Sequence, residues 1–192
     1  MSALLVLVLL SPGCAWIQEH QKTAMGAAIG AAGGAIVGGA YKGKKGALWG
    51  GLLGALAGGA IGAYLDHRDK TAAQTKQDYN YQPAQGVRLD LVGVGAKPQQ
   101  VQPGKQVDLQ ATYALMAPDD QQEVQVTETR VVTLDGAKVA ETTAQVARTS
   151  GTYTSVVPVT LPPDAAKGTY ELQVNLAAAG KTSQMKSAFT VN

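Results

Sequence analysis

The hydrophobic positions of this chain follow two different periods, one on each side of a polar stretch at residues 66–86. Before this stretch, over residues 23–65, glycines recur every fourth residue within a run of mostly alanine, isoleucine, leucine and valine. After it, from residue 87, apolar and polar residues alternate. A step of four nearly matches one helical turn, whereas a step of two is typical of a strand with one buried face. The pattern therefore predicts a helical part followed by an all-β part.

The glycine register forms two series, separated by the lysine-rich residues 41–45. The glycines in register are Gly26, Gly30, Gly34, Gly38, Gly46, Gly50, Gly54, Gly58 and Gly62. On a helix they would form a face without side chains, which allows close packing of helices in lipid. Each interior glycine costs a helix about 1 kcal/mol relative to alanine, and a bilayer offsets this cost because it enforces backbone hydrogen bonding. We therefore expect a two-helix glycine-zipper membrane hairpin over residues 23–65. A flexible Gly/Ala-rich linker is the alternative.

The N-terminus has the pattern of an export signal. Residues 3–10 are an uninterrupted apolar run, and Ser11, Pro12 and Gly13 precede the single cysteine, Cys14. The run is too short to span a membrane and fits a signal peptide with a small-residue cleavage site. The arrangement resembles a bacterial lipoprotein signal, which implies that residues 1–13 are removed and that Cys14 carries the acyl chains, palmitate included. Residues 14–22 would then be a lipidated tether. An ordinary signal peptide followed by an incidental cysteine is the alternative.

Cys14, the polar spacer, the two glycine series and the ending at residues 58–66 together resemble the glycine-zipper outer-membrane lipoproteins, including the rickettsial 17 kDa surface antigen type. The resemblance covers a little under a third of the chain. It implies a mature protein held by membrane lipid at the cell outer membrane, with its C-terminal part in the periplasm. Some of these lipoproteins carry a peptidoglycan-binding domain, whose Asp/Arg motif this sequence lacks.

The residues after the zipper divide into a linker and a second domain. Residues 66–86 are rich in charged and amide side chains and are expected to form a solvated polar linker. Over residues 87–192, seven short alternating segments are separated by turn residues, and Asp135-Gly136 is a two-residue hairpin signal. This pattern predicts an antiparallel immunoglobulin-like sandwich, and residues 168–172 resemble the tyrosine corner of such domains. The predicted fold is therefore a two-helix glycine-zipper membrane hairpin followed by an all-β Ig-like antiparallel sandwich.

The sequence does not favour an enzyme, a metal protein or a nucleic-acid-binding protein. The formal net charge is +2, and neither part of the chain concentrates the positive charge that nucleic acid requires. His20 and His67 have no second ligand nearby, so we expect both at the surface. Asp119, Asp120 and Glu123 lie at a predicted turn, where acidic side chains are usually solvated. The serines of the second domain have no histidine partner, so no catalytic residue or cofactor is expected.

These features predict a structural or interaction protein of the outer membrane. Membrane lipid would hold it, the zipper would make it a homo-oligomer, and the sandwich would face the periplasm, where it could bind an envelope protein. One alternative is an oligomeric pore or transport component, although no polar side chain lines either glycine-rich segment. Another is a sandwich that acts as an adhesive or chaperone-like module and captures an exported polypeptide through a free strand edge.

Overall fold

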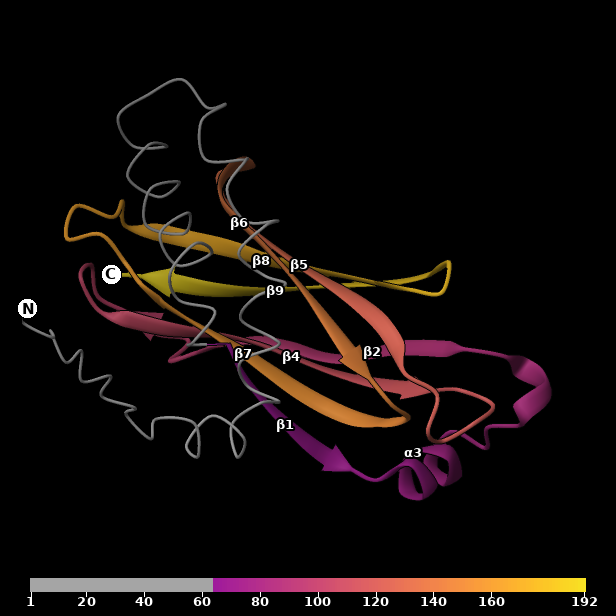
Figure 1. Cartoon of the computed structure of the whole chain (residues 1–192). Helices are drawn as coiled ribbons and strands as arrows, with labels where there is room; N and C mark the ends of the chain where they lie inside the picture. Colours follow the sequence, from indigo (N-terminus) through magenta and orange to yellow (C-terminus); the bar gives the residue numbers. More distant parts are fainter. Residues whose placement is uncertain (1–63) are drawn as a thin grey trace, which may run out of the picture.

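A computed structural model describes residues 64–192, which form two β-sheets packed face to face (Figure 1). One sheet has the strand order β1-β7-β4-β2 and the other has the order β3-β9-β8-β5-β6. Neighbouring strands are antiparallel except for β3 and β9, which are parallel. The strands are β1 (Leu65–Lys70), β2 (Arg88–Lys97), β3 (Gln100–Val101), β4 (Gln106–Met116), β5 (Val124–Leu134), β6 (Ala137–Arg148), β7 (Gly151–Thr160), β8 (Gly168–Ala178) and β9 (Lys181–Val191).

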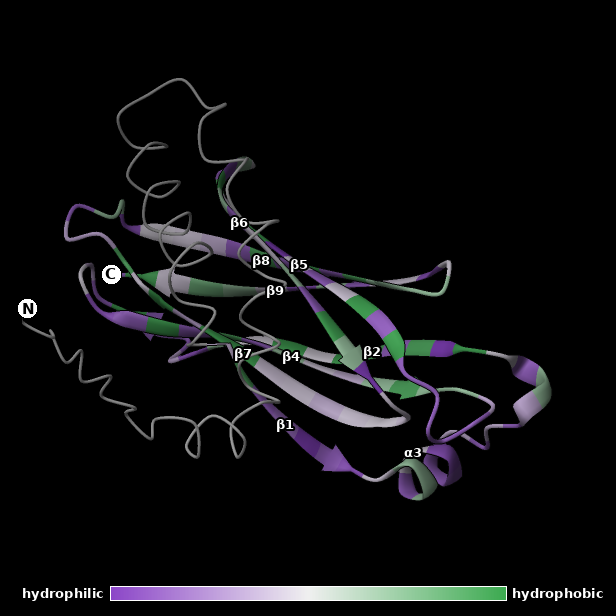
Figure 2. Ribbon diagram, viewed as in Figure 1, coloured by the Kyte–Doolittle hydropathy of each residue, from purple (hydrophilic) through white to green (hydrophobic). Residues whose placement is uncertain are grey.

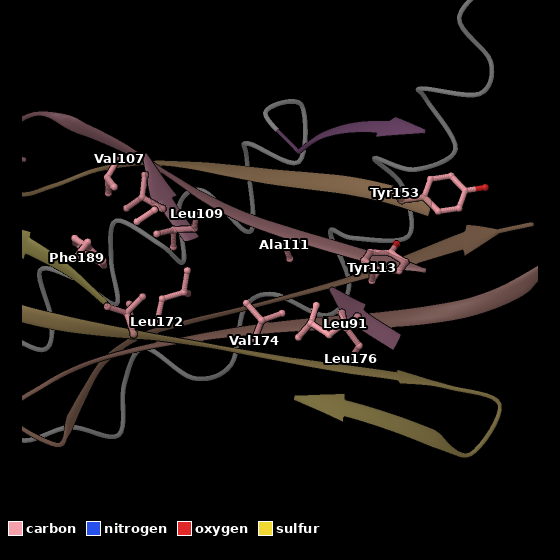
Figure 3. Packing of buried hydrophobic residues seen from close by; sticks show 14 of the residues in the cluster. Leu91, Val107, Leu109, Ala111, Tyr113, Tyr153, Leu172, Val174, Leu176 and Phe189 are labelled. Carbon is pink, nitrogen blue, oxygen red and sulfur yellow. The ribbon is translucent and has the colours of Figure 1, made fainter. Parts of the chain in front are cut away.

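The core lies between the two sheets and is built from the inward-facing residues of alternating strands. Hydrophobic and hydrophilic residues alternate along β2 and β5 (Figure 2). On β4 and β8 the inward positions include Leu109, Tyr113, Leu172 and Leu176, all buried (Figure 3). Each fully buried side chain of this kind contributes about 1.5–3 kcal/mol through the hydrophobic effect. The period-two pattern therefore corresponds to the positions that are buried between the sheets.

Residues with positive φ form two of the hairpin turns, and the first lies where the sequence predicts it. Asp135 and Gly136 join β5 to β6 with φ values of 52° and 77°, as a turn of type I′ requires. Ala179 and Gly180 join β8 to β9 with φ values of 48° and 73°. The Tyr170 hydroxyl donates a hydrogen bond of 2.7 Å to the carbonyl oxygen four residues upstream. This bond has the geometry of the tyrosine corner that the sequence suggested.

A short helix covers one end of the four-stranded sheet. The helix α3 (Ala72–Asp78) begins immediately after β1 and contacts β7 and β4. Thr71 and Gln74 form a capping box at its N-terminus, which satisfies two of the free backbone N–H groups. On its buried side, the Thr75 hydroxyl lies 3.0 Å from the Thr152 hydroxyl. A single 3₁₀ turn, η2 (Pro83–Gln85), then precedes β2.

The predicted fold class is wrong, although its all-β second part is confirmed. Leu65, which the prediction placed in the second membrane helix, is the first residue of β1. Residues 66–86, predicted as a solvated linker, contribute β1, α3 and η2. Within residues 64–192 the single α-helix, α3, has seven residues, and no helix is long and apolar enough to cross a membrane. The immunoglobulin-like type of the sandwich is not confirmed. The predictions for Cys14, the nine glycines and the hairpin up to residue 63 concern residues outside the described part of the chain.

The physical reason for the missed strand is that β1 is an edge strand. All six of its residues are exposed, and its place in the sheet comes from backbone pairing with β7 rather than from burial of side chains. Polar residues are compatible with such an edge, where they also discourage pairing with other chains. The chain therefore enters the two-sheet sandwich, residues 64–192, as soon as the glycine series ends.

Candidate functional site at the entry to the sandwich

Polar side chains gather between the sheets at the place where the chain enters the sandwich. Tyr64 lies two residues after Gly62, the last glycine in register, and directly before β1. The pairing of β1 with β7 runs from Leu65 opposite Val156 to Lys70 opposite Thr152. We call the group formed by Tyr64, Tyr113, Glu128, Arg130, Arg148 and Ser155 the junction cluster.

The carboxylate of Glu128 is the centre of the junction cluster. Glu128 lies on β5 with no exposed surface. The hydroxyls of Tyr64 and Tyr113 donate hydrogen bonds of 2.6 Å and 2.8 Å to its Oε1, and the Ser155 hydroxyl donates one of 2.7 Å to its Oε2. These donors come from the entering chain, β4 and β7. One buried charge therefore connects three separate parts of the sandwich.

Arg130 neutralises this buried carboxylate from the same strand. Arg130 is 1% exposed, and its Nη1 lies 3.2 Å from Oε2 of Glu128. Its Nη2 donates a hydrogen bond of 2.7 Å to the Ser155 hydroxyl. The Nε atom of Arg130 is buried without a hydrogen-bond partner. Because isolated buried charges are very unfavourable, neither Glu128 nor Arg130 is tolerated without the other.

Arg148 joins the two edge strands that border the cluster, β6 and β1. Its Nε donates a hydrogen bond to the Tyr113 hydroxyl and its Nη2 donates one to the Tyr64 hydroxyl, both at 3.2 Å. Its Nη1 makes an ion pair of 2.5 Å with Asp66 on β1. The guanidinium also lies over the ring of Tyr153, with its Cζ 5.0 Å from the ring centroid. Arg148 thus closes the side of the sandwich on which the chain arrives.

A second arginine holds β1 against β7. The Nη2 of Arg68 donates a hydrogen bond of 2.5 Å to the carbonyl oxygen of Ser150, and its Cζ lies 5.9 Å from the centroid of the Tyr153 ring. Gly151 leaves room for this contact. A Cβ at Gly151 would lie 2.7 Å from Nε of Arg68 and 3.0 Å from the carbonyl oxygen of Lys70. The absence of a side chain at this position is therefore a requirement for the docking of β1.

The electrostatics of the cluster separate one ionised group from two neutral ones. Burial alone would raise the pKa of Glu128, but the charge of Arg130 and the three hydrogen bonds from Tyr64, Ser155 and Tyr113 outweigh it, so the pKa lies below its ordinary value. Burial, and then the charge of Glu128, raises the pKa of both Tyr64 and Tyr113. Glu128 is consequently a carboxylate at neutral pH, and both phenols remain protonated donors.

The side chains of the junction cluster are arranged to hold Tyr64 in place rather than to react with a substrate. Both oxygens of Glu128 are occupied by protein donors, and the side chains of Tyr113, Ser155 and Arg130 are enclosed between the sheets. Tyr64 is the member that comes from outside the predicted sandwich. The arrangement fixes the position of Tyr64 and so the start of β1.

The predicted surface residues that the structure describes lie at the surface, whereas His20 lies outside the described residues. His67 lies on β1 with its side chain 81% exposed. Asp119, Asp120 and Glu123 are exposed in the loop between β4 and β5, and Asp120 pairs with Lys76 at 2.5 Å.

Sequence reasoning missed the junction cluster completely, although one signal for it exists. Along β5 the inward positions are Val124, Val126, Glu128, Arg130 and Val132. Two charged residues in an otherwise apolar period-two series indicate a buried ion pair. Their partners on β4, on β7 and before β1 are too distant in sequence for any local pattern to reveal them.

The comparison with protein families concerns the N-terminal part. Residues 1–66 match the family model described as YMGG-like Gly-zipper. The match spans about a third of the chain and includes all nine glycines in register, which confirms the glycine-zipper part of the prediction. It also supports a membrane-associated protein. No curated protein matches the chain.

The comparison with solved structures gives only distant likenesses. The chain is similar to the sporulation control protein Spo0M of Bacillus subtilis, with a TM-score of 0.36 and 14% identity over 56% of this chain and 49% of that one. It is similar to the alkylpurine DNA glycosylase AlkC of Pseudomonas fluorescens, with a TM-score of 0.39 and 12% identity over 63% of this chain and 37% of that one. It is also similar to a CARDB domain of Pyrococcus furiosus, with a TM-score of 0.34 and 11% identity over 55% and 87% of the two chains. The chain thus spans about half the length of Spo0M and less than half the length of AlkC. No functional argument follows from these likenesses.

Removing the charge of Glu128 should destabilise the protein strongly. Glu128→Gln leaves the guanidinium of Arg130 buried without a carboxylate, and breaking a buried pair in this way costs about 3–5 kcal/mol of the free energy of unfolding. Urea denaturation of the full chain, followed by near-ultraviolet circular dichroism, measures the loss. The matched control is Glu171→Gln, which removes an exposed carboxylate 2.8 Å from Lys186 and should cost less than about 1 kcal/mol. Equal effects of the two substitutions would contradict the central role of Glu128.

The pKa directions also predict a pH window for stability. The pKa of Glu128 is below its ordinary 4.5 in the folded state, so its contribution is complete above about pH 4.5 and is lost as pH falls through the folded pKa. The pKa values of Tyr64 and Tyr113 are above their ordinary 10.0, so their contribution is complete below about pH 10 and is lost at higher pH. We expect a plateau between these limits in urea denaturation. A Tyr113→Phe variant should lose less stability above pH 10 than the wild type does, and an unchanged alkaline slope would contradict the assignment.

Proposed function

We propose that this protein is an outer-membrane lipoprotein with a structural or interaction role, anchored through acyl chains on Cys14 and self-associating through its glycine zipper. Its sandwich would lie in the periplasm, held in a fixed position relative to the zipper. The observation that carries the proposal is the contact of Tyr64 with Glu128 and Arg148, two residues after the last zipper glycine.

The short connection between the zipper and the sandwich supports a fixed geometry. Only Ala63 and Tyr64 separate Gly62 from the start of β1. Tyr64 is held by two hydrogen bonds, and the next residues are held by the ladder with β7 and by the ion pair of Asp66. A flexible tether would let a domain search for partners, whereas a docked entry keeps the domain at one distance and orientation. This arrangement suits a spacer or scaffold more than a flexibly tethered domain that captures partners.

The regularity of the glycine series supports self-association. Small residues at intervals of four allow close backbone approach in lipid, where packing drives association. Two such series in one chain offer more packing surface than a single intramolecular contact uses. The match of residues 1–66 to a glycine-zipper model agrees with this role.

Fractionation of cells that express the full chain tests the anchor. Cys14→Ala should accumulate as the uncleaved precursor and disappear from the outer-membrane fraction, because the acyl acceptor is missing. The wild type should be processed and should stay with the outer membrane after carbonate extraction. Wild-type protein that carbonate releases would contradict the proposed membrane anchoring.

Amine-reactive crosslinking in the same membranes tests the zipper. Gly34→Leu/Gly54→Leu should reach the outer membrane but lose crosslinked oligomers, because the leucines block the glycine register. The matched control, Gly33→Leu/Gly51→Leu, adds the same volume outside the register and should retain them. Oligomers that survive the first pair, or that both pairs abolish equally, would show that the register is not the contact.

A further inference from the structure

The four edge strands of the sandwich differ in how well they are protected against pairing with another chain. β1 carries five charged or histidine residues, Asp66 to Lys70, and its register with β7 shifts between Arg68 and Lys70. β3 has only two residues and lies between Pro98 and Pro103. Charges, irregular register, short length and nearby prolines are the usual protections of an edge.

The edge at β2 is protected by the opposite sheet. Its register with β4 shifts between Leu91 and Gly93. β2 also packs against β9, where the backbone N–H of Leu91 donates a hydrogen bond of 3.0 Å to the Ser183 hydroxyl. Three of the four edges therefore carry at least one feature that prevents strand addition.

β6 is the least protected edge, because its one register shift with β5, between Val132 and Thr133, lies near one end of the strand. Among residues 64–192, no strand pairs with its outer side (Figure 1). Residues 140–148 pair with residues 124–132 of β5 without any shift, which makes a regular edge about 30 Å long. Residues 142–147 contain no charge, proline or glycine. The charged residues of β6 are already paired, Lys138 with Glu141 and Arg148 with Asp66, each at 2.5 Å.

We propose that β6 pairs with β6 of a second copy of this chain, antiparallel about a two-fold axis, so that two five-stranded sheets become one. The inference rests on the proposed function in one respect, since the zipper brings the copies together. The uncharged stretch 142–147 fits an identical stretch without placing like charges opposite each other. A symmetric contact also satisfies the free backbone groups of both copies at once.

The pattern of the strand selects the register. Backbone N–H and C=O groups of alternate residues point out from an edge, so two identical edges pair only when opposed residue numbers are both even or both odd. The regular stretch 140–148 pairs over its full length when Ala144 lies on the axis. Thr143 then lies opposite Gln145, and Thr142 opposite Val146. No like charges oppose each other, whereas an axis at Thr143 would place Lys138 opposite Arg148.

Disulfide crosslinking in membranes tests this register, because Cys14 is the single native cysteine. Ala144→Cys should form a disulfide-linked dimer under mild oxidation, since opposed Cα atoms in an antiparallel pair lie about 4.5–5.5 Å apart, within disulfide range. Gln145→Cys should form little, because its counterpart is displaced along the strand. Ala177→Cys, exposed on the interior strand β8, and the unsubstituted chain measure the background. A yield at Ala144→Cys no higher than at Ala177→Cys, or equal yields at positions 144 and 145, would overturn the proposal.

A charge exchange provides a second test, and its matched control distinguishes loss of strand pairing from misfolding. Added to Ala144→Cys, the pair Thr143→Lys/Gln145→Lys opposes lysines across the axis and should lower the dimer yield by a factor of about 2 to 10. The matched pair Thr143→Lys/Gln145→Glu opposes unlike charges and should retain the yield. Equal yields from the two pairs would instead favour an occupant other than β6 itself, such as an extended segment of another exported polypeptide. If amine-reactive crosslinking detects zipper oligomers but Ala144→Cys forms no disulfide-linked dimer, this inference alone is overturned. Wild-type membranes without crosslinked oligomers would count against the proposed function.

Discussion

The structure depends on the burial of one negative charge, the carboxylate of Glu128, between two apolar sheets. A buried carboxylate must be neutralised and hydrogen-bonded. Arg130 on the same strand pairs with this one. Tyr113 and Ser155 of the opposite sheet and Tyr64 of the entering chain donate hydrogen bonds to it. Because Tyr64 supplies one of the donors, the sandwich is complete only when the residue next to the glycine zipper is in place. The residue at which the described chain begins is therefore part of the core of the sandwich.

A cluster of this kind contributes position more than stability. Buried ion pairs lose much of their Coulomb attraction to desolvation, and apolar residues of similar volume often stabilise a core equally well. What apolar residues could not do here is fix β1, whose six side chains are all exposed. Tyr64, Asp66 and Arg68 hold the strand instead through directional contacts with Glu128, Arg148 and the carbonyl of Ser150. The glycine at position 151 completes the fit by leaving space for Arg68.

The strands that bury one face could be predicted from the sequence, and the edge strand could not. Val107, Leu109 and Tyr113 mark β4 by their alternation alone, and Asp135-Gly136 marks the hairpin by its need for positive φ. β1 has no alternation to detect, so the extension of the zipper helix to Leu65 and the solvated linker after it were the natural but wrong predictions. The nine glycines identified the zipper, which the family model confirms. The junction cluster could not be predicted because its charged residues Glu128 and Arg130 are close together on β5. The residues that donate hydrogen bonds to Glu128 lie 15 to 64 positions away in the sequence.

Hydrogen–deuterium exchange of the full chain tests the docked entry most directly. If the chain is fixed from Tyr64 onward, the β1 amides that pair with β7 should exchange far more slowly than those of unstructured chain. In Gly151→Ala, where the new Cβ displaces Arg68, that protection should fall while β8 remains protected. Exchange of the β1 peptide at the rate of unstructured chain in the wild type, with β7 and β8 protected, would contradict the docked entry and restore a flexible linker between the zipper and the sandwich.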